Sequence, residues 1–308
     1  MSSPPSPLPS ELRPESTRSG RWILVILGGG LAFILLTAIH PEPIRAAWAE
    51  LERIIQLKSA PLPASPARIS DHETEDLDSL EPQQQAQRLL ERAVNHYEGA
   101  IELIAARVDS WYGRITLDPQ LNGLVTTALN SNDLRVRAAA IEVDLAAYNL
   151  PKSSNSAFSL LDRAQNDPGG RPWALWMLGA LANRGVEPDR IQNFLLDQLR
   201  SPDENTRYWA VEGLALLGTD ATIAPLLEVF HTDASLKVRE RAACSLAQSG
   251  MLTREQRMLA VPDFLRFTDD PSLDPTTRSW AFQALRDITG QSLGNDPSAW
   301  RAWWANRR

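Results

Sequence analysis

The strongest constraint in this sequence is a short pattern, built on an arginine, that occurs five times. Successive arginines lie 34, 36, 32 and 39 residues apart, and an alanine stands three residues after each of them. Leucine stands seven residues after the arginine in four copies, whereas Asp144 takes that position in the first copy. These positions share one face of an α-helix, so the pattern predicts an apolar helical stripe. The five arginines are Arg137, Arg171, Arg207, Arg239 and Arg278.

Each copy also carries signals for the start of a helix. An aspartate precedes the arginine by four residues in four copies, and Ser235 takes that place in the fifth. Both residue types cap helix N-termini well. A shorter amphipathic segment, such as Ile191–Leu199 or Ile223–Phe230, precedes the arginine helix. A period of this length predicts an all-α fold, an α-solenoid of about five helix pairs over residues 115–290. The four aspartates are Asp133, Asp167, Asp203 and Asp274.

The array resembles HEAT repeats, in which the second helix of each pair carries an Asp, Val-Arg and Ala-Ala pattern. Residues 134–140 (Leu-Arg-Val-Arg-Ala-Ala-Ala) and 236–243 (Leu-Lys-Val-Arg-Glu-Arg-Ala-Ala) match that pattern best. The resemblance covers roughly residues 115–308, and the ending Trp300-Arg301-Ala302-Trp303-Trp304 is similar to the tail of bacterial members. It implies that the aspartates and arginines named above form a structural ladder between repeats. It also implies that the second helices line a concave surface. It says little about activity, because function on such a scaffold depends on surface sites.

The N-terminal region differs in composition from the repeats. Residues 1–20 are rich in Ser and Pro and are predicted to be disordered. Ile23–Ile39 contains seventeen residues without a charge, which predicts a transmembrane anchor over residues 22–40. A cleaved signal peptide and a buried core helix are the alternatives, although small residues before a nearby cleavage site are lacking. Arg18 and Arg21 lie close to the apolar run. They favour a single-pass protein of a bacterial inner membrane, with a cytoplasmic N-terminus and a periplasmic solenoid.

Four further segments flank the repeats. Residues 43–58 predict a short amphipathic helix, which either lies on the membrane or pairs with another helix. Residues 59–82 predict a Pro-rich and acidic linker. Residues 83–114 have apolar positions spaced four and three apart and predict a long helix that caps the first repeat. Alternatively, this helix self-associates through residues 83–111, and part of it resembles a tetratricopeptide helix pair. Residues 291–308 predict a Trp-rich C-terminal cap.

Composition and motifs argue against several classes of site. Residues 115–308 carry 20 basic and 23 acidic residues, so they have no basic excess for binding nucleic acid. Cys244 is the only cysteine, which excludes an intramolecular disulfide and a cysteine-cluster metal site. The four histidines lack metal-ligand spacing, and the sequence contains neither a phosphate-binding loop nor a nucleophile motif. We therefore expect no catalytic, cofactor or metal site.

Tryptophan is the informative residue type. Trp173, Trp209 and Trp280 each stand two residues after a repeat arginine, and Trp176 follows one turn later. At about 100° per residue, the three equivalent rings point roughly 140° away from the middle of the apolar stripe. They either pack between repeats or lie on the concave surface, where partly exposed aromatics bind partners. The sequence favours a membrane-anchored scaffold that binds a protein or peptide there. The alternative is a lyase-like enzyme or accessory factor on the same scaffold.

Overall fold

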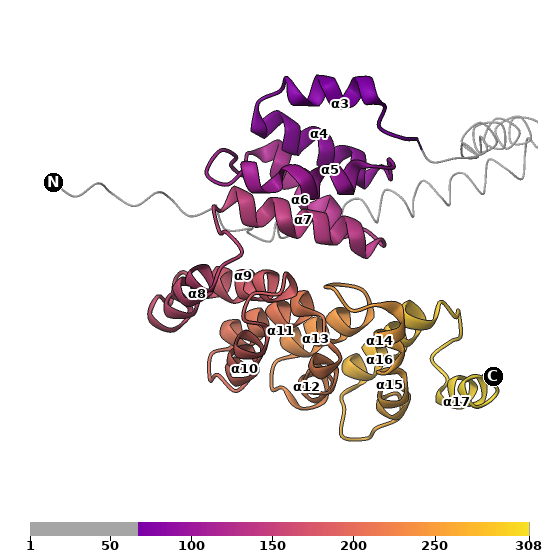
Figure 1. The fold of residues 1–308 in the computed structure, drawn as a ribbon. Helices are drawn as coiled ribbons and strands as arrows, with labels where there is room; N and C mark the ends of the chain where they lie inside the picture. The colour runs from indigo at the N-terminus through magenta and orange to yellow at the C-terminus, as the bar shows by residue number, and fades with distance from the viewer. Residues whose placement is uncertain (1–66, 308) are drawn as a thin grey trace, which may run out of the picture. The chain divides into compact units, whose positions relative to one another are not determined.

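The computed structural model describes residues 67–307, which form successive helices (Figure 1). The regular structure in this range is helical, apart from an isolated bridge between Arg68 and Glu98. The expected disordered tail, membrane anchor and amphipathic helix, all within residues 1–58, lie outside the described residues. Of the helices that the structure does describe, none has the length and apolarity needed to cross a bilayer.

The acidic segment that the sequence assigned to a linker contains the first described helix, α3 (Asp71–Asp78). The Ser70 side chain caps this helix by accepting a hydrogen bond from the backbone N–H of Glu73. Leu77 is fully buried, and the Glu73 carboxylate pairs with Arg92 at 2.8 Å. The linker prediction is therefore wrong for this segment, because a cap, a buried leucine and an ion pair fix it as a helix.

The single long helix expected over residues 83–114 is divided in two by the structure. His96 and Gly99 adopt left-handed backbone angles, with φ of 58° and 87°, and a right-handed helix cannot continue through them. The resulting helices pack against each other and against the first repeat, so they cover its apolar side. The elements are α4 (Pro82–Val94), α5 (Ala100–Arg107) and the 3-10 helix η1 (Val108–Ser110).

The remaining helices form the repeat array, which confirms the all-α solenoid fold. In Figure 1 the consecutive pairs lie side by side, running from magenta to yellow. The first four pairs are α6 (Pro119–Leu129) with α7 (Leu134–Ala147), α8 (Ser154–Asn166) with α9 (Arg171–Asn183), α10 (Pro188–Gln198) with α11 (Glu204–Leu217), and α12 (Asp220–Thr232) with α13 (Leu236–Ala247). The fifth repeat and the C-terminal helix are α14 (Arg254–Met258), α15 (Val261–Phe267), α16 (Pro275–Thr289) and α17 (Pro297–Ala305).

Most of the repeat helices start as the sequence suggests. Asp133, Asp203, Ser235 and Asp274 each accept a backbone N–H of the following helical turn. Asp167 differs, because it stands at the C-terminus of α8 and Gly170 precedes the first residue of α9. The two glycines after Pro168 are poor helix formers, so the helix begins three residues later than in the other copies.

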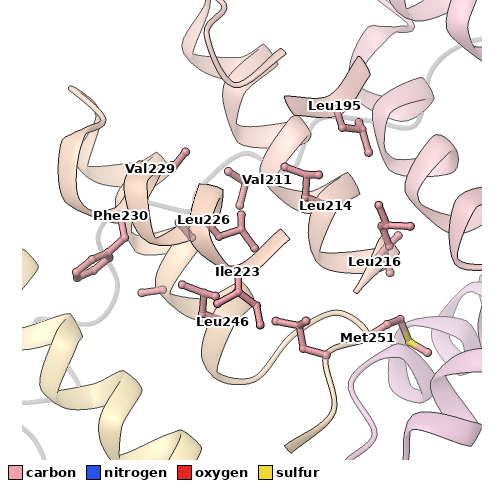
Figure 2. Close-up of a cluster of buried hydrophobic side chains, with 14 of the residues drawn as sticks. Leu195, Val211, Leu214, Leu216, Ile223, Leu226, Val229, Phe230, Leu246 and Met251 are labelled. Carbon is pink, nitrogen blue, oxygen red and sulfur yellow. The ribbon is translucent and has the colours of Figure 1, made fainter. Parts of the chain in front are cut away.

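Two apolar cores share helix α7. The first extends over α3–α7, and the second runs from α7 to α17. Nine of the fourteen residues of α7 are buried, including the polar Arg137 and Asp144. Figure 2 shows part of the second core, where Leu214 of α11 lies among side chains from α10, α12 and α13. Helix α7 therefore has no broad solvent-facing side, and two of its polar residues, Arg137 and Asp144, are buried within the array.

The C-terminal cap is the helix α17, which packs against α15. It begins with Asp296 as the N-cap and Pro297 as the first residue. Trp300 is fully buried, and its indole donates a hydrogen bond of 2.8 Å to the carbonyl of Gly294. Trp303 and Trp304 pack partly buried against the same core, so this end of the array is covered by aromatic side chains.

Candidate functional site

The repeat arginines connect neighbouring repeats in two places. Arg207 donates two hydrogen bonds to the Asp233 carboxylate, of 2.7 and 3.0 Å, and Arg239 approaches Asp274 at 3.3 Å. In both cases the arginine reaches the turn of the following repeat. Asp233 was not among the residues predicted to form the ladder. Its position could have identified it, because it lies two residues before the cap Ser235 in a turn of the same kind.

The other repeat arginines bind backbone carbonyls instead of aspartates. Arg171 and Arg278 donate to carbonyl oxygens that end or follow the preceding helix. Asp133 and Asp203 serve as helix caps and are not partners of the repeat arginines. The ladder between repeats is therefore carried by two arginine–aspartate pairs, whereas Arg171 and Arg278 hold individual turns together.

We expect Arg207→Ala to lower the free energy of unfolding by about 2 kcal/mol, because it leaves the buried Asp233 carboxylate without its partner. Arg200→Ala is the matched control, since Arg200 is 83% exposed and pairs with Asp197 on the surface. That change should alter stability by less than about 0.5 kcal/mol. Urea denaturation of both variants measures the difference. Equal losses in the free energy of unfolding would show that the Arg207–Asp233 pair stabilises the fold no more than a surface ion pair does.

Arg137 brings the first and fourth repeats together. Its guanidinium donates to the carbonyls of Gln248, at 2.8 Å, and Gly250, at 2.5 Å, in the loop after α13. Arg257 donates to the same Gln248 carbonyl, and burial together with the Arg137 charge lowers the pKa of Arg257 to about 10. The two cations cluster around carbonyls at the C-terminus of α13, where the helix dipole is negative. These contacts hold the loop after α13 against α7, beside a space that is partly open to solvent.

This space, which we call the concave cavity, has a volume of about 340 Å³. It is lined by α6, α7, α9, α11, α13 and the loop after α13. Of the four tryptophans expected to bind a partner, Trp173 and Trp176 line it. Trp209 contacts the edge of Trp176, with ring centroids 6.4 Å apart, but lies outside the lining. Trp280 is half-buried on α16 and does not line the cavity.

The cavity tryptophans combine the two roles that the sequence left open. Trp173 packs at 5.2 Å and 64° against Tyr148 of the preceding repeat, and Trp176 packs against Trp209 of the following one. Both rings nevertheless stay partly exposed, and Tyr148 is 41% exposed. Tyr148, Trp173 and Trp176 therefore join repeats and also present an aromatic surface to the cavity.

Asp144 is the most unusual group in the cavity. It occupies the repeat position that holds a fully buried leucine in the other four copies, and it is itself only 6% exposed. Burial raises the pKa of its carboxyl to about 7, and a hydrogen bond from the Trp176 indole partly opposes this effect. Among the described residues it belongs to no ion pair. The departure from leucine was visible in the sequence and is the signal that identifies this site.

The remaining charges in the cavity are compensated. Arg241 stands at the position that Trp173 and Trp209 occupy in their repeats, and it lies 3.3 Å from the Glu212 carboxylate. Burial raises the pKa of Glu212, and the Arg241 charge opposes that rise. The Arg137 guanidinium donates hydrogen bonds to backbone carbonyl oxygens. The cavity thus holds two arginines and a glutamate with partners, and one carboxylate without an ionic partner.

Comparison with known proteins agrees with this architecture. Residues 156–247 match a family model described as HEAT repeats. This stretch is similar to HEAT repeats. The matched HEAT stretch runs from α8 to the end of α13 and includes Trp173 and Trp176. A search of curated proteins found no match to the chain.

Proposed function

We propose that the chain is a non-enzymatic scaffold that binds a protein or peptide partner in the concave cavity of its HEAT-like array. Concave surfaces are the usual binding surfaces of helical-repeat proteins. The observation that carries the proposal is the cluster of Tyr148, Trp173 and Trp176, whose partly exposed rings line one hollow. Aromatic side chains of this kind contribute most of the binding energy in many interfaces.

A photo-crosslinking amino acid placed at single positions of the full-length chain tests this proposal in cells. Thr126 is exposed and lines the cavity, whereas Asn193 is exposed on α10, which contributes nothing to the cavity. We expect a discrete crosslinked protein from position 126 and none from position 193. Trp176→Ala should remove the crosslink at position 126. Equal crosslinking from both positions would reject the cavity as the binding surface.

We assign no catalytic step to the cavity. The residues that line it include no histidine or cysteine, and the Ser249 hydroxyl accepts a hydrogen bond from Arg241. No feature of the described residues favours the lyase-like alternative over binding.

We further propose that residues 22–40 anchor the scaffold in a bacterial inner membrane, with the repeats in the periplasm. The support is the uncharged run Ile23–Ile39 and the two arginines directly before it. A reporter that is active only in the periplasm, fused after Arg308, should therefore be active. Activity of a cytoplasm-only reporter at the same position would reverse the orientation and leave the fold unaffected.

A further inference from the structure

The concave cavity contains a carboxyl group without an ionic partner. Asp144 lines the cavity together with Trp176, and its side chain is more than nine-tenths buried. An ionised carboxylate in such a place is unfavourable unless a cation or several donors compensate it. The isolated protein therefore lacks the group that would best satisfy this side chain.

The repeat fold does not require a carboxylate at this position. Four equivalent positions are filled by leucines that are fully buried: Leu178, Leu214, Leu246 and Leu285. Leucine has a high helix propensity, and apolar burial is what the repeat stripe otherwise uses. Asp144 consequently weakens the local packing, as residues at binding sites often do.

The charged groups around Asp144 leave room for an added cation. On α7, Arg137 lies two turns away, about 10 Å along the helix, and donates to three carbonyls. On α13, Arg241 pairs with Glu212 of α11. Helix α9 presents indoles to the cavity, Tyr148 follows α7, and α6 presents apolar, hydroxyl and amide side chains. A cation beside Asp144 would thus meet no free positive group.

The walls next to Asp144 suit an alkyl chain that ends in a cation. Tyr148, Trp173 and Trp176 offer aromatic surface, which attracts cations and packs against methylene groups. The volume of about 340 Å³ lies at the small end of ligand pockets, and it therefore suits one side chain better than a helix. An ammonium carries three N–H donors and a guanidinium five, and the single Asp144 carboxylate can accept from only two of them, so the ammonium leaves fewer donors unpaired in the cavity.

We propose that the concave cavity binds a lysine side chain of the protein partner, with the ammonium at Asp144 and the methylenes against Trp173 and Trp176. This inference rests on the proposed scaffold function, and it specifies which side chain of the partner enters the cavity. The same side chain that disturbs the repeat core then becomes the main determinant of which partner segment is accepted.

The full-length chain in detergent micelles can be titrated with Nα-acetyl-lysine methylamide while the indole N–H signals of Trp173 and Trp176 are followed by NMR. We expect saturable shifts with a Kd of roughly 1 mM, which is typical of so small a probe. The uncharged norleucine analogue and the corresponding arginine derivative should each bind at least tenfold more weakly. Binding of the norleucine analogue as tight as that of the lysine probe, or no binding of the lysine probe, would overturn the proposal.

Two variants make the test specific to the carboxylate. Asp144→Asn keeps the size of the side chain and should weaken the lysine probe at least tenfold, while Asp197→Asn on the surface of α10 should leave its affinity unchanged. Unchanged affinity in Asp144→Asn would reject Asp144 as the acceptor. If the lysine probe does not bind but crosslinking at position 126 persists, the scaffold function is retained and the lysine proposal is rejected. If the probe binds but crosslinking fails, the cavity takes a free amine and the protein partner is rejected.

Discussion

Asp144→Asn should make the folded protein more stable at pH 8 and leave its stability almost unchanged at pH 4. The pKa of the Asp144 carboxyl is raised to about 7 by burial, whereas an unfolded aspartate titrates near 3.9. Between these values the folded state holds a proton that the unfolded state has lost. The free energy of unfolding therefore falls as the pH rises from about 4 to about 7. Asparagine removes this contribution because it has no charge to bury.

The expected gain at pH 8 is about 4 kcal/mol at most, since each pKa unit corresponds to roughly 1.4 kcal/mol. It is measured as the difference between variant and parent in urea denaturation across the pH range, which cancels other titrating groups. Of those near the cavity, Glu212 also has a raised pKa and is present in both proteins. Asp197→Asn should show no such gain. A variant that is equally or less stable than the parent at pH 8 would mean that Asp144 is well compensated in the folded protein.

Gly179→Ala should destabilise the protein by about 3 kcal/mol, although alanine is normally the better helix former. Helices α9 and α11 approach so closely here that an added Cβ would lie 2.7 Å from the Cα atom of Gly213. Gly213 is equally confined, since its own Cβ would lie 2.5 Å from the Leu175 carbonyl. Backbone atoms cannot move aside as a flexible side chain does, so the two helices must separate along their interface.

Gly123→Ala is the matched control for that change. Gly123 also lies within a helix, α6, but it is exposed and a Cβ there would meet nothing within 4 Å. The same substitution should therefore stabilise the protein by about 0.5–1 kcal/mol. Thermal melts of the two variants should move in opposite directions. A stabilising effect at both positions would show that α9 and α11 are not in close backbone contact.

The repeat helices were predictable because their signals are local. The arginine, alanine and leucine positions repeat at helical spacing, and a polar cap precedes four of the five helices. The break at His96–Gly99 was missed because the apolar spacing of four and three continues across it, whereas the left-handed angles are set by the packing of α4 on α5. Helix α3 was missed because ion pairs with α4 and α5, distant in sequence, neutralise two of its acidic residues.

The candidate site was only partly predictable for a related reason. Periodicity predicted that Trp173, Trp176, Trp209 and Trp280 share the concave surface. In the folded array only Trp173 and Trp176 line the cavity. The loop after α13, which also lines the cavity, is held by Arg137, which donates to carbonyls more than a hundred residues away. Helical periodicity relates residues that are close in sequence, so it cannot predict such a contact. The aspartate at the leucine position was in contrast visible in the sequence, although its burial beside the tryptophans was not.

Titration of the Asp144 carboxyl by carbon-13 NMR in the full-length chain shows whether this group is buried without a compensating cation. Its signal can be assigned by its absence from Asp144→Asn. We expect a midpoint near pH 7 in the free protein, because the carboxyl group is buried without a cation. Saturation with Nα-acetyl-lysine methylamide should lower the midpoint by at least one unit, since a bound ammonium favours the charged form. A midpoint near 4 that the probe does not change would contradict the claim that the concave cavity holds an uncompensated carboxylate for a partner's lysine.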